Sequence, residues 1–125
     1  MGNPVVHFEI LSPDAAKLQK FYAELFGWTI NADNSMQYGI ADTGATGKGI
    51  NGGIGVPMDG KNRVTFYVGV DSIDDTFAKL AAAGGKAMGP KMTVPPSGPV
   101  LGYFTDPAGN TIGLVEMSSS YNPGG

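Results

Sequence analysis

Two hydrophobic patterns alternate along the chain, and the first is that of a half-buried strand. In residues 5–11 every second residue is apolar, which predicts a strand with one face toward the core. His7 and Glu9 occupy the intervening positions, so we expect them to share the opposite face.

A helical pattern follows. Apolar residues recur at spacings of three and four between Ser12, a candidate N-cap, and Gly27, a candidate helix stop. Three short strands are then expected, at residues 28–31, 36–41 and 53–58.

The same order of patterns then returns. Residues 63–70 read as a strand, Ser72 begins a second helix and Gly84 ends it. Three further strands are expected, at residues 86–94, 100–105 and 111–117. Because Asp14 and Asp71 are separated by the same interval as Gly27 and Gly84, we infer a duplicated βαβββ unit.

The repeat predicts one domain with two modules. The modules span residues 4–58 and 63–117, and the domain residues 1–117. Residues 118–125 are polar and rich in glycine and proline, which predicts a flexible tail.

Composition narrows the possible chemistry. The chain of 125 residues contains no cysteine, which excludes disulfides and thiol nucleophiles, and its one histidine excludes a three-histidine zinc centre within one chain. The formal charge is −3, and no basic stripe suggests nucleic-acid binding. No apolar stretch approaches the ~20 residues of a membrane span, and no signal-peptide pattern is present. We therefore expect a cytoplasmic protein that binds neither nucleic acid nor membrane.

Three motifs resemble the vicinal oxygen chelate superfamily, which includes glyoxalase I, bleomycin-resistance proteins and extradiol dioxygenases. They are the run FYAELFGW at residues 21–28, Ala83-Gly84-Gly85 after the second helix, and DPAGN at residues 106–110. The resemblance implies an α+β fold in which two βαβββ modules form a cup-shaped mixed β-sheet with the helices outside. It also implies a homodimer.

The resemblance implies a metal-ligand set that this chain only half supplies. Metal-using members take one ligand from the first strand and one from the last strand of each module. His7 and Glu116 match two of these positions, and we predict both as metal ligands and catalytic residues. The other two positions fall on Val64 and Met58, which are poor ligands for zinc. The cofactor therefore stays open, with a divalent metal ion as the candidate.

The predicted strands also supply side chains for an apolar ligand pocket. Alternation in the last strand places Leu114 on the face of Glu116. Aromatic residues and methionine suit a flat, hydrophobic molecule. The predicted ligand-binding residues are Glu9, Trp28, Tyr38, Met58, Phe66, Tyr103 and Leu114.

Three functions remain open. The first is a protein that binds a small hydrophobic or aromatic ligand, like the bleomycin-resistance type. The second is a metal-dependent lyase or isomerase of glyoxalase I type that uses His7 and Glu116. The third is a non-catalytic protein-interaction domain. A structural role for His7, hydrogen-bonded to Glu116 or Glu9, is the alternative to each functional role.

Overall fold

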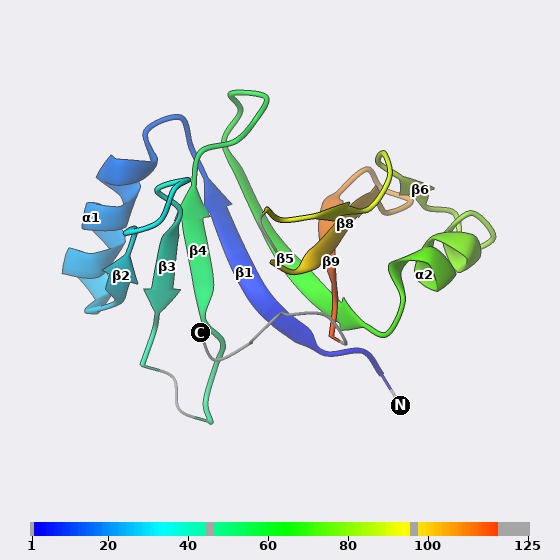
Figure 1. The fold of residues 1–125 in the computed structure, drawn as a ribbon, viewed down its shortest axis with the longest axis horizontal. Coiled ribbons are helices and arrows are strands. Elements are labelled where there is room, and N and C mark those ends of the chain that lie inside the picture. Colours follow the sequence, from blue (N-terminus) through cyan, green and yellow to red (C-terminus); the bar gives the residue numbers. More distant parts are fainter. Residues whose placement is uncertain (1, 45–46, 96–97, 118–125) are drawn as a thin grey trace. The chain divides into compact units, whose positions relative to one another are not determined.

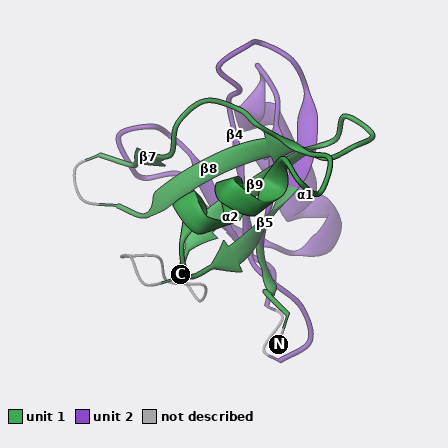
Figure 2. Cartoon of the chain, turned by 90° about the vertical axis from the view of Figure 1, so that its right-hand side faces the viewer, with its two compact units in different colours: residues 1–6, 66–122 green, residues 7–65, 123–125 purple. Residues whose placement is uncertain are grey.

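The computed structural model describes residues 2–44, 47–95 and 98–117. The chain divides into two compact units (Figure 2). Unit 1 comprises residues 1–6 and 66–122, and unit 2 comprises residues 7–65 and 123–125. The predicted tail at 118–125 lies outside the described residues.

Unit 2 is a mixed sheet with one helix. Its strands follow the order β2-β3-β4-β1, with β1 and β4 parallel and the other neighbours antiparallel. Figure 1 shows α1 beside this sheet, next to β2 and β3. The elements are β1 (Val5–Leu11, from His7 onward in this unit), α1 (Ala15–Phe26), β2 (Thr29–Asn31), β3 (Gly39–Asp42) and β4 (Gly52–Gly55).

Unit 1 repeats the arrangement. Its strands follow the order β5-β9-β8-β6, β7 pairs with β8, and β5 runs parallel to β9. The elements are β5 (Arg63–Val70, from Phe66 onward in this unit), α2 (Ile73–Leu80), β6 (Lys86–Ala87), β7 (Met92–Thr93), β8 (Val100–Thr105) and β9 (Thr111–Glu116).

The α+β class and the mixed sheet with two helices are confirmed. The single strand expected at residues 86–94 is wrong, because β6 and β7 are separate two-residue strands. Gly89, at φ +72°, and Pro90 lie between them. A positive φ and a proline both interrupt a strand's regular pairing, so one strand cannot run through this segment.

The helix ends are set by local chemistry. Asp14, and not Ser12 as predicted, is the N-cap of α1, and its carboxylate accepts from Lys17 N at 3.4 Å. Gly27 ends α1 at φ +72°, as predicted, because this left-handed conformation favours glycine. In α2, Ser72 is the predicted N-cap, and its hydroxyl accepts from Asp75 N at 3.1 Å.

Each unit has its own apolar core. In unit 2, Ala15, Ala41 and Ile54 are buried. In unit 1, two clusters occupy opposite faces of the strands. One cluster contains Val6, Tyr67 and Val115, and the other contains Val70, Ile73 and Leu114. None of the helices in the described part of the chain is long and apolar enough to cross a membrane.

Candidate functional site

The polar face of β1 carries the most distinctive group of side chains in unit 2. His7 and Glu9 lie on one face of β1, as predicted, while Phe8 on the other face contacts the ring of Trp28. The Tyr38 hydroxyl lies between the two polar side chains, 2.9 Å from His7 Nε2 and 2.9 Å from Glu9 Oε2. We call His7, Tyr38 and Glu9 the polar triad.

Tyr38 reaches this position because β4 has no side chains in its path. A Cβ atom on Gly53 would overlap the Tyr38 hydroxyl, and one on Gly55 would lie 2.6 Å from the Tyr38 ring. Glu9 is the register partner of Gly53 in the parallel β1–β4 pair. The glycines of β4 therefore provide the surface on which the tyrosine ring lies beside β1.

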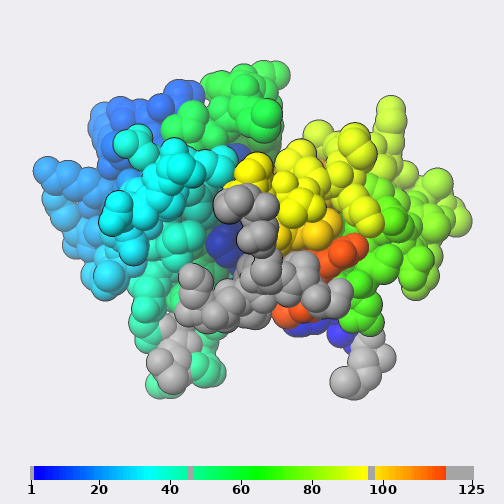
Figure 3. Space-filling model, in the orientation of Figure 1, coloured from blue at the N-terminus to red at the C-terminus, as the bar shows by residue number. Residues whose placement is uncertain are grey.

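The backbone of Tyr38 is held by a neighbouring turn. Asn34 Oδ1 accepts from Tyr38 N at 3.0 Å, and Asn34 Nδ2 donates to Tyr38 O at 2.7 Å. Gln19 of α1 donates to Gln37 O and to Ile54 O. This segment before β3, coloured cyan, lies at the surface in the space-filling view (Figure 3). Sequence reasoning missed Asn34 and Gln19, although Asn34 lies in a polar segment typical of a turn.

Burial keeps the imidazole of the triad uncharged. Glu9 is 8% exposed, and burial lowers the pKa of His7 to about 4. His7 is therefore neutral at pH 7 and carries one N–H. Since Tyr38 donates its only proton to Glu9 Oε2, its oxygen accepts from His7 Nε2–H.

A second hydroxyl contact lies in unit 1. The hydroxyls of Tyr67 and Tyr103 are 2.6 Å apart, and their rings meet edge to face. Tyr67 lies over Gly113, its register partner in β9, where a Cβ atom would overlap the ring. In both units, therefore, a tyrosine ring covers a glycine of the module's last strand.

The sequence analysis did not select Tyr67 and selected two residues on the opposite face. Phe66 precedes Tyr67 in β5 and is 40% exposed. Leu114 is 2% exposed and packs with Val70 and Ile73 in the core of unit 1. Both faces of these strands carry apolar residues, so the alternation gave no marker of which face bears the tyrosine hydroxyls.

Glu116 has a structural partner within unit 1. Its Oε2 accepts a hydrogen bond from the backbone N–H of Ile73 at 2.9 Å. Ile73 is the first residue of α2 and is fully buried, so the carboxylate satisfies an N–H that the helix itself leaves unpaired. His7 belongs to unit 2 and Glu116 to unit 1.

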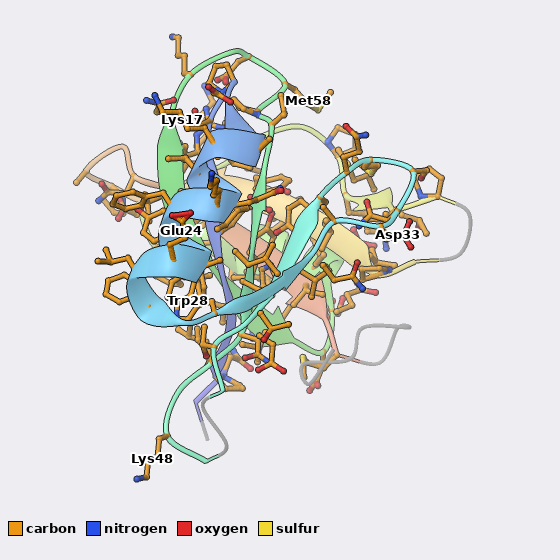
Figure 4. All side chains as sticks on the ribbon, turned by 90° about the vertical axis from the view of Figure 1, so that its left-hand side faces the viewer. Lys17, Glu24, Trp28, Asp33, Lys48 and Met58 are labelled. Atoms are coloured by element: carbon orange, nitrogen blue, oxygen red, sulfur yellow. The ribbon has the colours of Figure 1, made fainter. Side chains whose placement is uncertain are left out.

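Trp28 and Met58 lie in contrasting surroundings. Trp28 contacts the rings of Phe8, Tyr22 and Phe26, with centroids 5.4–5.5 Å apart. Met58 is fully exposed in the segment after β4. Figure 4 shows Trp28 below α1 and Met58 away from it. Trp28 is thus part of an aromatic cluster, whereas Met58 projects from the surface of unit 2.

The donor atoms do not fit the metal set that the sequence resemblance implies. Within residues 2–44, 47–95 and 98–117, no three histidine, aspartate or glutamate side chains gather closely enough to hold a metal ion. His7 Nε2 is hydrogen-bonded to Tyr38, and Glu116 Oε2 is hydrogen-bonded to Ile73. A zinc site usually takes three or four protein ligands.

Comparison with known proteins identifies the family. The model of the Glyoxalase-like domain family matches residues 6–115, so the chain belongs to this family. A relative from Didymella fabae, described as a glyoxylase-like domain-containing protein, is 28% identical over 116 residues, covering 82% of this chain and 85% of the relative.

Solved structures of the vicinal oxygen chelate superfamily share the fold. A glyoxalase/bleomycin resistance protein/dioxygenase superfamily member from Vibrio splendidus matches with a TM-score of 0.63 and 14% identity, covering 92% of this chain and 98% of that one. The Mn(II)-bound glyoxalase from Novosphingobium aromaticivorans matches with a TM-score of 0.66 and 18% identity. That match covers 94% of this chain and 40% of the glyoxalase. The vicinal oxygen chelate fold predicted from the motifs is confirmed.

Proposed function

We propose that this protein binds a small hydrophobic or aromatic molecule at the polar triad of unit 2, without a metal ion. The proposal rests mainly on the two hydrogen bonds of the Tyr38 hydroxyl, whose oxygen lies 2.9 Å from His7 Nε2 and 2.9 Å from Glu9 Oε2. Burying a carboxylate and an imidazole costs folding free energy, and such perturbed groups concentrate at functional sites. Bound against the triad, a flat molecule would meet a small number of fixed polar atoms, and such atoms orient the ligand in typical binding sites.

The metal-dependent lyase or isomerase of glyoxalase type is the second candidate. Its support is the similarity in fold to a glyoxalase described as Mn(II)-bound. The engaged atoms of His7 and Glu116 favour the binding protein instead. Cytoplasmic location and a homodimer stay predictions.

The experiment is an NMR titration that uses the only histidine of the chain as the reporter. The probes are 2-naphthol, indole and benzoate, each added with EDTA present. At least one probe is expected to shift the His7 imidazole resonances with saturation. Tyr38→Phe removes the central hydroxyl and is expected to weaken that binding roughly five- to tenfold, as for one hydrogen bond of about 1 kcal/mol.

Tyr22→Phe is the matched control, since it removes a hydroxyl from α1 in the same unit and leaves the triad intact. Its affinity should equal that of the wild type. The proposal is overturned if none of the probes shifts His7 at millimolar concentration, or if binding requires a divalent metal ion.

A further inference from the structure

The Tyr38 hydroxyl lies between two side-chain atoms of the types that bind metal ions, His7 Nε2 and Glu9 Oε2. This oxygen is 2.9 Å from a histidine nitrogen and 2.9 Å from a glutamate oxygen. Zinc binds the same two types of atom at about 2.0–2.2 Å. Histidine and glutamate donors would therefore need to close in by less than about 1 Å to bind an ion at this point.

The nitrogen of His7 and the oxygen of Glu9 that could bind a metal ion are instead hydrogen-bonded to Tyr38. Tyr38 accepts from His7 Nε2–H and donates to Glu9 Oε2, so one hydroxyl joins a neutral imidazole to a buried carboxylate. A protonated Nε2 has no lone pair for a metal ion. The bonds through Tyr38 thus engage both donor atoms.

The position of the hydroxyl is fixed from two sides. Asn34 holds the N–H and the C=O of Tyr38, and Gly53 and Gly55 leave the space in which its ring lies. Because Asn34 holds the backbone of Tyr38 and His7 and Glu9 hold its hydroxyl, an ion that displaced the hydroxyl would have to break hydrogen bonds and also lose part of its hydration.

We propose that Tyr38 is a positioning residue whose hydroxyl takes the place of a metal ion between His7 and Glu9. The chain therefore contains a latent two-ligand metal site on β1, which the tyrosine closes. This inference goes beyond ligand binding and is tested without an organic ligand, so it can fail independently of the proposed function.

The deciding variant is Tyr38→His. An imidazole is shorter than a phenol, and a metal–nitrogen bond of about 2 Å would span much of the difference. The variant would bring two histidines and one glutamate together, a ligand set found in zinc enzymes. Calorimetric titration with Zn²⁺ is expected to show about one ion bound per chain. Adding His7→Ala to this variant should abolish the binding.

Tyr22→His is the matched control because it introduces a second imidazole into unit 2 on α1, outside the polar triad, and it should bind no stoichiometric Zn²⁺. The wild type should bind none through His7, and its His7 resonances should not move with Zn²⁺. Wild-type binding that depends on His7 overturns the inference. A folded Tyr38→His protein without Zn²⁺ affinity also overturns it, and if that variant does not fold, the wild-type titration still decides.

Discussion

Glu116 and Ile73 are joined by a hydrogen bond of 2.9 Å, from the first backbone N–H of α2 to the carboxylate that ends β9. The two residues are far apart in sequence, so this bond fastens the start of the helix to the last strand of unit 1. Ser72 accepts from Asp75 N at the same helix end. Two side-chain acceptors thus satisfy two of the N–H groups in the first turn of α2, those of Ile73 and Asp75.

Glu116→Ala is expected to lower the free energy of unfolding by about 1–2 kcal/mol, because the buried N–H of Ile73 loses its partner. Glu116→Gln keeps an acceptor oxygen and should lose less. Urea unfolding measures both. Glu24→Ala, an exposed carboxylate on α1, serves as the control and should stay within about 0.5 kcal/mol of the wild type. Equal stability of Glu116→Ala and the wild type would show that the bond contributes nothing.

Acid should destabilise the protein through His7. Burial lowers its folded-state pKa from 6.5 to about 4, so the unfolded chain takes up this proton first as the pH falls. Stability is therefore lost with decreasing pH in the window between these values, by up to about 1.4 kcal/mol per pH unit. Between pH 6.5 and 5 the loss from this group is about 1.5 kcal/mol.

His7→Gln isolates this contribution, since the carboxylates titrate in both proteins. Unfolding free energies at pH 7, 6 and 5 should fall less steeply in the variant than in the wild type. NMR titration of the single imidazole gives the pKa directly. Parallel pH profiles, or a His7 pKa near 6.5, would rule out the buried neutral imidazole.

The Trp28 ring should matter for stability. It contacts Phe8, Tyr22 and Phe26, so Trp28→Ala removes the centre of an aromatic cluster and is expected to cost about 3 kcal/mol in urea unfolding. Phe21→Ala on α1 is the comparison, because its ring is 52% exposed and should cost less. A greater loss for Phe21 than for Trp28 would be inconsistent with the packing.

Much of the fold was predictable because its signals are local. The alternation around His7, the N-cap at Ser72 and the glycine stop at Gly27 each depend on a few neighbouring residues. The predicted stop of the second helix at Gly84 is wrong, because α2 ends at Leu80 with Ala81 as its C-cap. The single strand predicted at residues 86–94 is wrong although Gly89 and Pro90, the residues that divide it, are visible in the sequence.

The candidate site was predictable only in part. His7 and Glu9 follow from the period of one strand, but Tyr38 reaches them from a different part of unit 2. The position of Tyr38 depends on the space beside Gly53 and Gly55, which have no side chain, and on the hydrogen bonds of its backbone with Asn34. A contact between segments that are far apart in the chain produces no regular residue spacing from which it could be predicted. The same holds for Tyr67 and Gly113 in unit 1.

The polar triad is proposed to be a hydrogen-bonded site that needs no metal ion. The first measurement is therefore the elemental analysis of wild-type protein purified without chelator, with His7→Ala beside it. Far less than one divalent ion per chain is expected in both proteins. A stoichiometric divalent ion in the wild type that is lost in His7→Ala would contradict the proposal and would favour the metal-dependent lyase or isomerase.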